Sequence, residues 1–154
     1  MKITEKLLLE KGACAVQVDR FVRLFPKRIY PHGVTVTVSG CIDVAVEFDW
    51  AWLARNLLSP HARRAYYVAT DEAAKICSEA LTAARAAFDF DVARKWEEYD
   101  QNALLNLVGA REDFNRWFFP RVIAYRQNYE RIMEIFKEVC APEWAKAFLA
   151  DRPR

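Results

Sequence analysis

Hydrophobic and aromatic residues recur at every third or fourth position over more than half of the chain. This spacing is typical of a helix with one buried stripe. The stripe consists of Ala62, Tyr66, Ala69, Ala73, Ile76, Ala80, Ala84, Phe88, Val92, Trp96, Tyr99, Ala103, Leu107, Ala110, Phe114, Phe118, Val122, Tyr125, Tyr129, Ile132, Phe136 and Val139. One straight helix of that length would span on the order of 115 Å, so a compact domain must fold it back. The pattern therefore predicts two or three long antiparallel helices.

Three places in this region could reverse the chain. Asp89-Phe90-Asp91 offers an N-cap, Gly109 is a typical C-terminal stop, and Pro120 removes one backbone hydrogen bond. After the stripe, Ala141-Pro142 predicts the start of a last short helix that ends at Leu149.

The first third of the chain contains short elements separated by turn residues. Thr4 can cap a helix that runs to Gly12, and apolar residues at helical spacing predict a second helix over 13–25. Pro26 ends that helix, and the Pro, Gly and basic content of 26–33 is typical of a loop.

Residues 34–48 fit two local structures. Valine alternates with threonine in the first half, and Gly40 separates this run from a second alternation, which favours a β-hairpin. The alternative is a helix capped by Thr37 or Ser39. Because an isolated hairpin is marginally stable and no other stretch offers a third strand, we favour a helix over 38–47.

A clearer helix begins at Asp49. It places Trp50 and Leu57 on its apolar side, and we expect both residues to be structural. The helix ends at Ser59-Pro60, a strong boundary because Ser favours the N-cap and Pro favours the first position of the next helix.

Length and composition support one all-α domain over 1–154. The 154 residues are 53% hydrophobic, which is enough apolar material for a core and excludes a mainly disordered chain. We expect a part made of short helices, 1–59, to pack on the two or three long antiparallel helices of 60–154. A β-hairpin over 34–48 is the local alternative to this all-helical prediction.

Charge and candidate chemistry narrow the function classes. The net charge is +2, and the arginines at every fifth position from Arg111 to Arg131 spiral around a helix by about 140° per step, so they form no basic stripe. Protein binding is therefore the favoured hypothesis, and nucleic-acid association is the alternative. The sequence contains neither a Gly-rich phosphate loop nor clustered Cys and His, so we expect no cofactor, no metal and no enzyme activity. An unrecognised enzyme is the third hypothesis.

The cysteines and the apolar runs bear on the compartment. Cys14, Cys41, Cys77 and Cys140 are far apart, and no apolar run approaches the ~20 residues of a membrane-spanning helix. The N-terminus also lacks the apolar segment of a signal peptide. We expect reduced, buried thiols in a cytoplasmic protein that does not associate with membranes.

The segment Arg116-Trp117-Phe118-Phe119-Pro120-Arg121 is the most specific candidate site. Phe118 belongs to the buried stripe, so Trp117 and Phe119 point to its two flanks, about 100° away on either side. Trp and Arg are frequent in protein-binding hot spots. Either this helix is central and covered on several sides, or Arg116, Trp117, Phe119 and Arg121 form an exposed surface for a protein partner, with a homo-oligomer among the options. The loop from Lys27 to His32 is the next candidate.

A further pattern runs through the N-terminal segment and consists of Gly12-Ala13-Cys14, Val18, Phe21 to Pro26, Gly33-Val34-Thr35 and Phe48 to Ser59. Together with the Ala-, Arg- and Tyr-rich helical runs that follow, it resembles a group of small bacterial and phage proteins of unknown function. The resemblance implies a helical protein, supports the helix over 38–47 and implies no activity. It also implies an origin in a mobile element, and from this we expect a small inhibitor of a host defence complex of the CRISPR type (an anti-CRISPR protein).

Overall fold

The computed structural model describes residues 2–104 and 109–151 and is predominantly helical. The all-α prediction is confirmed, with only a minimal two-stranded sheet in addition. In chain order the elements are β1 (Lys2–Ile3), α1 (Glu5–Glu10), α2 (Ala15–Leu24), β2 (Val34–Thr35), α3 (Val38–Asp43), the 3-10 helix η1 (Ala45–Glu47), α4 (Trp50–Leu57), α5 (Pro60–Leu104) and α6 (Ala110–Ala150). Among these residues, no helix combines the length and the apolar character that crossing a membrane requires.

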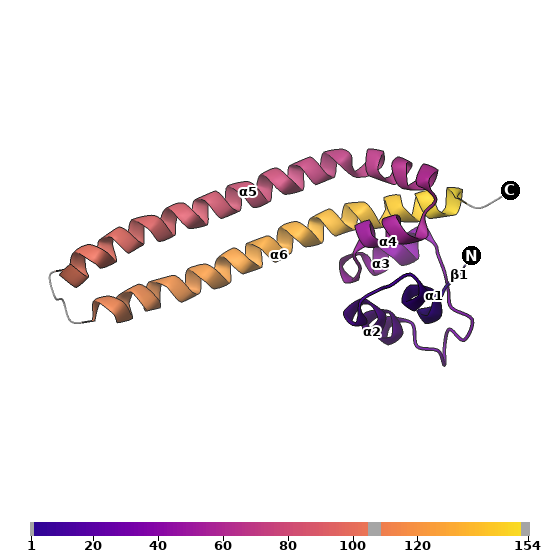
Figure 1. Ribbon diagram of the computed structural model, residues 1–154, viewed down its shortest axis with the longest axis horizontal. Coiled ribbons are helices and arrows are strands. Elements are labelled where there is room, and N and C mark those ends of the chain that lie inside the picture. Colours follow the sequence, from indigo (N-terminus) through magenta and orange to yellow (C-terminus); the bar gives the residue numbers. More distant parts are fainter. Residues whose placement is uncertain (1, 105–108, 152–154) are drawn as a thin grey trace. The chain divides into compact units, whose positions relative to one another are not determined.

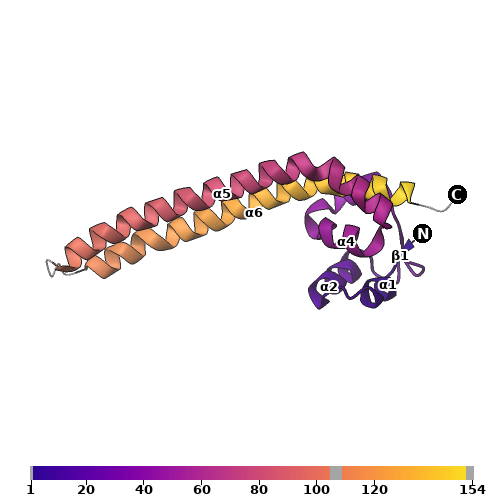
Figure 2. The ribbon, with the colours of Figure 1, turned by 45° about the horizontal axis from the view of Figure 1, so that its top comes forward.

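The predicted stripe is divided between two long helices, α5 and α6, which lie side by side in both views (Figures 1 and 2). They are antiparallel, because Cys77 contacts Met133 whereas Trp96, further along α5, contacts Phe114. Of the three predicted turning points, Gly109 lies at the start of α6 with a φ of 91°. Leu107, one position of the stripe, lies outside the described residues.

The other predicted interruptions are wrong. Asp89 and Asp91 lie inside α5, where each pairs with an arginine on the same helix and so favours continuation over a break. Pro120 and Pro142 lie inside α6, so the separate last helix predicted from Ala141 does not exist. A proline removes one backbone hydrogen bond, but packing along the rest of a 41-residue helix can outweigh that loss.

The described residues form two compact units. One contains 2–73 and 134–151, and the other contains the described residues of 74–133, so α5 and α6 each contribute to both. These units differ from the predicted parts, 1–59 and 60–154, because compactness follows contacts between distant segments rather than order along the chain. The prediction of a single domain stays a prediction.

The helices α1 and α4 of the first unit begin directly after the residues that were predicted to cap them. Thr4 accepts a hydrogen bond from the Leu7 amide at 3.1 Å, and Asp49 accepts one from the Trp52 amide at 2.9 Å. The helix predicted over 13–25 is α2, one or two residues shorter at each end. Helix caps of this kind depend on neighbouring residues alone, which is why the sequence predicted them.

The segment 34–48 follows the helical alternative for most of its length. Thr37 accepts a hydrogen bond from the Gly40 amide at 3.0 Å and caps α3, and η1 follows. The hairpin is wrong, yet Val34–Thr35 does form a strand, because β1 pairs with it in antiparallel register, Ile3 opposite Val34. This pairing was not predicted, since a two-residue strand at the N-terminus has no recognisable alternation.

The core of the first unit is built around Trp144 of α6, which is fully buried. Its ring stacks on Phe148 with centroids 4.9 Å apart and lies 5.5 Å from that of Trp50 on α4. Trp50 is buried and Leu57 is partly buried against the same core, in agreement with the structural roles predicted for both. The C-terminal part of α6 thus supplies the centre on which the short N-terminal helices pack.

A polar contact joins the beginning of α5 to the end of α6 within the same unit. The Asp151 carboxylate accepts hydrogen bonds from the Ser59 amide, at 2.7 Å, and from the Ser59 hydroxyl. Ser59 in turn accepts one from the Ala62 amide at 3.3 Å, which satisfies a free amide in the first turn of α5. The hydrogen bonds from Ser59 lower the pKa of Asp151 below its ordinary value of 3.8.

We expect Asp151→Ala to lower the melting temperature at about pH 7 and to have little effect at low pH. A carboxylate with a depressed pKa stabilises the fold above its unfolded pKa, and this stabilisation is lost as the pH falls through the folded value. Melting curves of the wild type and the variant should therefore converge as the pH falls below the ordinary Asp value of 3.8 and through the lower folded pKa. A difference that is constant with pH would show that the carboxylate charge contributes nothing.

Candidate protein-binding surface

The second unit is held together by aromatic side chains between α5 and α6. Phe88 stacks on Tyr125 with ring centroids 4.8 Å apart, and Phe114 meets Trp96 edge-on at 5.2 Å. At the other end of the unit, the Cys77 sulfur lies 4.0 Å from that of Met133. The four aromatic residues belong to the stripe predicted from the sequence, and Cys77 and Met133 each follow a stripe position directly, so the stripe marks the contact between the two helices.

The second unit nevertheless buries very few side chains. Among the described residues of 74–133, only Cys77 is buried, because two helices cannot enclose the stripe between them. Several large apolar side chains are exposed: Ile76, Phe90, Trp96, Leu104, Phe119, Ile123 and Tyr129. Exposed apolar residues are typical of a protein-interaction site where several of them share one side of the molecule.

The four candidate residues have different surroundings. Arg116 is exposed and lies 3.5 Å from Asp113 on its own helix. Trp117 is half-buried, and the Arg121 guanidinium lies over its ring, 5.8 Å from the centroid, at cation–π distance. Phe119 is 59% exposed, whereas its neighbour Phe118 is half-buried and stacks on Phe114.

These residues do not form one patch, because α6 presents them in different directions. Relative to Phe118, Phe119 is rotated by about +100° and Trp117 by about −100°, while Arg116 points outward at about 160°. Trp117 and Arg121 therefore share one flank of the helix pair, and Phe119 lies on the opposite flank.

The flank that carries Phe119 also includes residues of α5 that were not among the predicted site residues. On two antiparallel helices, rotations of the same sign from the facing stripe lead to the same side of the pair. Trp96, rotated by about +80° from Phe88, is therefore on the side of Phe119. We call this side the Phe119 flank; it contains Arg85, Asp89 and Trp96 on α5, and Phe119, Ile123, Arg126 and Glu130 on α6.

Two ion pairs lie on the Phe119 flank, one on each helix. Arg85 is 2.7 Å from Asp89, and Arg126 is 2.9 Å from Glu130, each pair spanning one helical turn. Asp89, with a smaller contribution from Tyr125, raises the pKa of the Arg85 guanidinium. The flank thus combines exposed apolar residues with charges of both signs. A helical wheel of each helix could have found its members, but only the antiparallel pairing shows that they share a side.

The second candidate, the loop from Lys27 to His32, is partly engaged within its own unit. Lys27 pairs with Glu5 at 2.9 Å, and the Tyr30 ring meets Phe25 edge-on at 5.6 Å. Ile29 is exposed. The loop therefore offers a smaller apolar surface than the Phe119 flank does.

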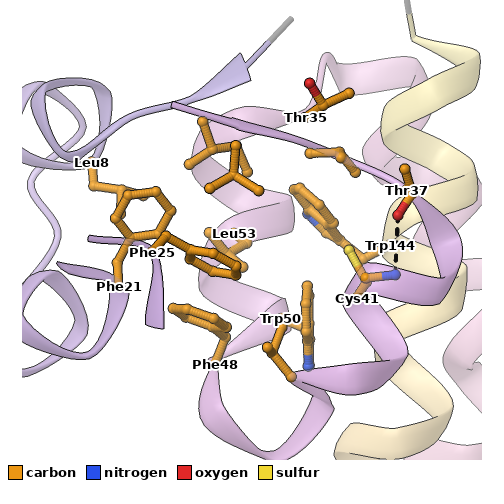
Figure 3. Close-up of a pocket in the computed structure, with 15 residues that line it drawn as sticks. Leu8, Phe21, Phe25, Thr35, Thr37, Cys41, Phe48, Trp50, Leu53 and Trp144 are labelled. Carbon is orange, nitrogen blue, oxygen red and sulfur yellow. Dashed lines mark hydrogen bonds between the residues drawn. The ribbon is translucent and has the colours of Figure 1, made fainter. Parts of the chain in front are cut away.

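The first unit contains an apolar cavity of about 80 Å³. Figure 3 shows Phe48, Trp50, Leu53 and Trp144 around it, together with Cys41. The Trp144 indole N–H is buried and has no hydrogen-bond acceptor among the described residues. Burial raises the pKa of the Cys41 thiol to about 11, so this thiol stays protonated and is a poor nucleophile.

Candidate chemistry elsewhere is sparse in the part of the chain that the structure describes. No group of three His, Cys, Asp or Glu residues there is arranged to hold a metal ion. The cysteines are free thiols, but the expectation that all four are buried is wrong for Cys14, which is exposed. Cys14 is the N-cap of α2, a position outside the apolar face of that helix.

Comparisons with protein-family models, with curated proteins and with solved structures find no match to this chain.

Proposed function

We propose that this protein is a non-catalytic protein-binding module that uses the Phe119 flank of α5 and α6. The observation that supports this most directly is the exposed apolar surface of a helix pair that buries almost nothing of its own. Trp96, Phe119 and Ile123 are each at least half exposed, and their burial in an interface would be favourable.

Charge favours a protein partner over a nucleic acid. Residues 74–133 contain nine basic and nine acidic side chains, so the unit that carries the flank has no net charge. Arg116 and Arg126 are paired with acids on α6. A nucleic-acid site gains its affinity from unpaired basic groups along one face, whereas Arg85 and Arg126 of the Phe119 flank are each paired with an acid.

A finer proposal is that the partner belongs to a bacterial defence complex of the CRISPR type, which this protein would inhibit in the host cytoplasm. Its support is the resemblance of the N-terminal segment to small bacterial and phage proteins. The exposed surface agrees with an inhibitor that acts by occupying a partner, but it does not favour one defence complex over another.

Alanine substitutions of three neighbouring aromatic residues test the proposal. We expect Phe119→Ala to melt near the wild-type temperature and to lose capture of the partner from host extract, because an exposed aromatic contributes mainly to binding. Phe118→Ala should instead lower the melting temperature, because this ring packs on Phe114 and Phe88. The measurements are thermal melts and affinity capture with the tagged protein.

Trp117→Ala identifies the flank that binds. It should retain the partner if the Phe119 flank is the binding surface, and lose it if the opposite flank is used. Equal, early melting of all three variants would mean that the helix is covered on every side, and the proposed surface would be wrong.

A further inference from the structure

The apolar cavity of the first unit has walls that suit an uncharged occupant. Its lining includes five aromatic side chains: Phe21, Phe25, Phe48, Trp50 and Trp144. None of the described residues that line it is charged. A charged molecule would lose its hydration there without gaining a partner of opposite charge, which is unfavourable. The walls therefore select a neutral molecule.

The two indole groups at the wall differ in their hydrogen bonding. The Trp50 indole nitrogen donates to the Ala45 carbonyl at 2.6 Å, so it needs no further acceptor. Trp144 is fully buried, and its indole N–H has no acceptor among the described residues. The Trp144 side chain extends from α6 to the cavity (Figure 3). Because a buried donor without an acceptor costs free energy, an occupant that offers an acceptor to Trp144 is favoured.

The polar groups elsewhere at the wall are turned away or already bonded. The Thr35 side chain is exposed and points away from the aromatic rings (Figure 3), and the Thr37 hydroxyl accepts a hydrogen bond from the Gly40 amide. A buried water usually makes about three hydrogen bonds, and a hydroxyl group brings a donor that needs an acceptor of its own. A carbonyl oxygen only accepts, so it can bond to Trp144 and leave no donor unpaired.

The volume of the cavity limits the size of its occupant. An apolar protein cavity of about 150 Å³ holds benzene, which has about 25 Å³ of that space for each non-hydrogen atom. At the same ratio, the cavity of about 80 Å³ has room for about three or four non-hydrogen atoms.

We infer that this cavity is a binding site for a small neutral carbonyl compound of the size of a short ketone. Its oxygen accepts a hydrogen bond from the Trp144 indole N–H, and its carbon atoms contact the aromatic rings. The cavity lies in the first unit and the Phe119 flank in the second, so the inference does not depend on the proposed function.

Nuclear magnetic resonance of the isotope-labelled full chain tests the hydrogen bond directly. Acetone is the probe, because it has one carbonyl oxygen on a body of the right size. We expect the Trp144 indole N–H signal to move downfield as acetone is added and to saturate in the millimolar range, since so few atoms limit the affinity. The Trp50 indole signal should move far less, because its N–H is already bonded to Ala45.

Two further probes separate charge from size. Acetate has the same number of non-hydrogen atoms as acetone and nearly the same shape, but it is charged, so we expect no shift of the Trp144 signal. Cyclohexanone retains the carbonyl group on a body larger than benzene, which exceeds the volume of the cavity, and it should also leave the signal in place.

Substitutions at two buried cysteines provide the matched comparison. Cys41 lines the cavity, and Cys41→Leu adds two non-hydrogen atoms to its wall, so the acetone-induced shift should disappear. Cys77→Leu is the control, because Cys77 is also buried but lies in the second unit, and its titration should match that of the wild type. Val44→Ile adds one carbon at a half-buried position of the same wall and should weaken binding if Cys41→Leu does not fold.

Three results would overturn the inference. The first is a Trp144 signal that acetone leaves in place up to ~100 mM, and the second is an equal shift with acetate. The third is a folded Cys41→Leu protein that responds to acetone as the wild type does. None of these measurements involves the Phe119 flank, so failure of the cavity site is distinguishable from failure of the protein-binding function.

Discussion

Trp50→Ala is expected to destabilise the protein by about 3–5 kcal/mol, the usual range for truncation of a buried Trp. The Trp50 side chain is only 4% exposed, and its ring lies 5.5 Å from that of Trp144. Its indole nitrogen donates a hydrogen bond to the Ala45 carbonyl at 2.6 Å. The substitution therefore creates a cavity and leaves a buried carbonyl without its donor, two costs that add.

Thermal unfolding followed by circular dichroism measures this effect. For a chain of this size, such a loss corresponds to roughly 10 °C or more in melting temperature, or to the absence of folded protein. Trp96→Ala is the matched control, because Trp96 is half exposed in the other unit and should change the melting temperature far less. If the Trp50→Ala protein melts like the wild type, Trp50 does not contribute to the stability of the core.

Gly33→Ala should also be strongly destabilising. Gly33 has a φ of 81°, a conformation that costs a residue with a Cβ about 1–2 kcal/mol. A Cβ at this position would also lie 2.5 Å from the Thr4 Cγ2 atom and would overlap the Ile3 carbonyl oxygen. Ile3 forms the pairing with Val34, so relief of the overlap requires movement of β1 or β2. We expect a loss of about 3 kcal/mol or more, since strain and displacement add.

Gly12 provides the control for this prediction. Its φ is 76°, close to that of Gly33, but nothing lies within 4 Å of a Cβ placed there. Gly12→Ala should therefore show the conformational cost alone, and chemical denaturation of both variants should separate the two contributions. Equal losses in the two variants would mean that the contact between Gly33 and β1 contributes nothing to stability.

Local chemistry explains which parts of this fold could be predicted from the sequence. Thr4, Thr37 and Asp49 cap helices by accepting hydrogen bonds from amides three residues further along the chain, so their effect needs no distant partner. The stripe that includes Phe88 and Phe118 is likewise a periodicity of one helix, and it correctly indicated the faces along which α5 and α6 meet.

The errors arose where distant residues decide the outcome. Pro120 and Pro142 are weak helix residues by local rules, yet α6 continues through both, and the turn beyond Pro142 contains Trp144, the centre of the first unit's core. Val34–Thr35 became a strand because Ile3 is beside it, although the two segments are 30 residues apart along the chain. A rule that considers neighbouring residues cannot weigh such contacts.

The candidate site shows the same division. Adjacent aromatic residues on a helix differ in direction by about 100°, so the sequence alone determined that Trp117 and Phe119 point to opposite flanks of Phe118. Only the tertiary structure decided that Trp96 and the two ion pairs lie on the side of Phe119, because that depends on which helix pairs with α6 and in which direction. Only the tertiary structure showed as well that this stripe stays partly open, since burial requires a third surface and two helices cannot provide it.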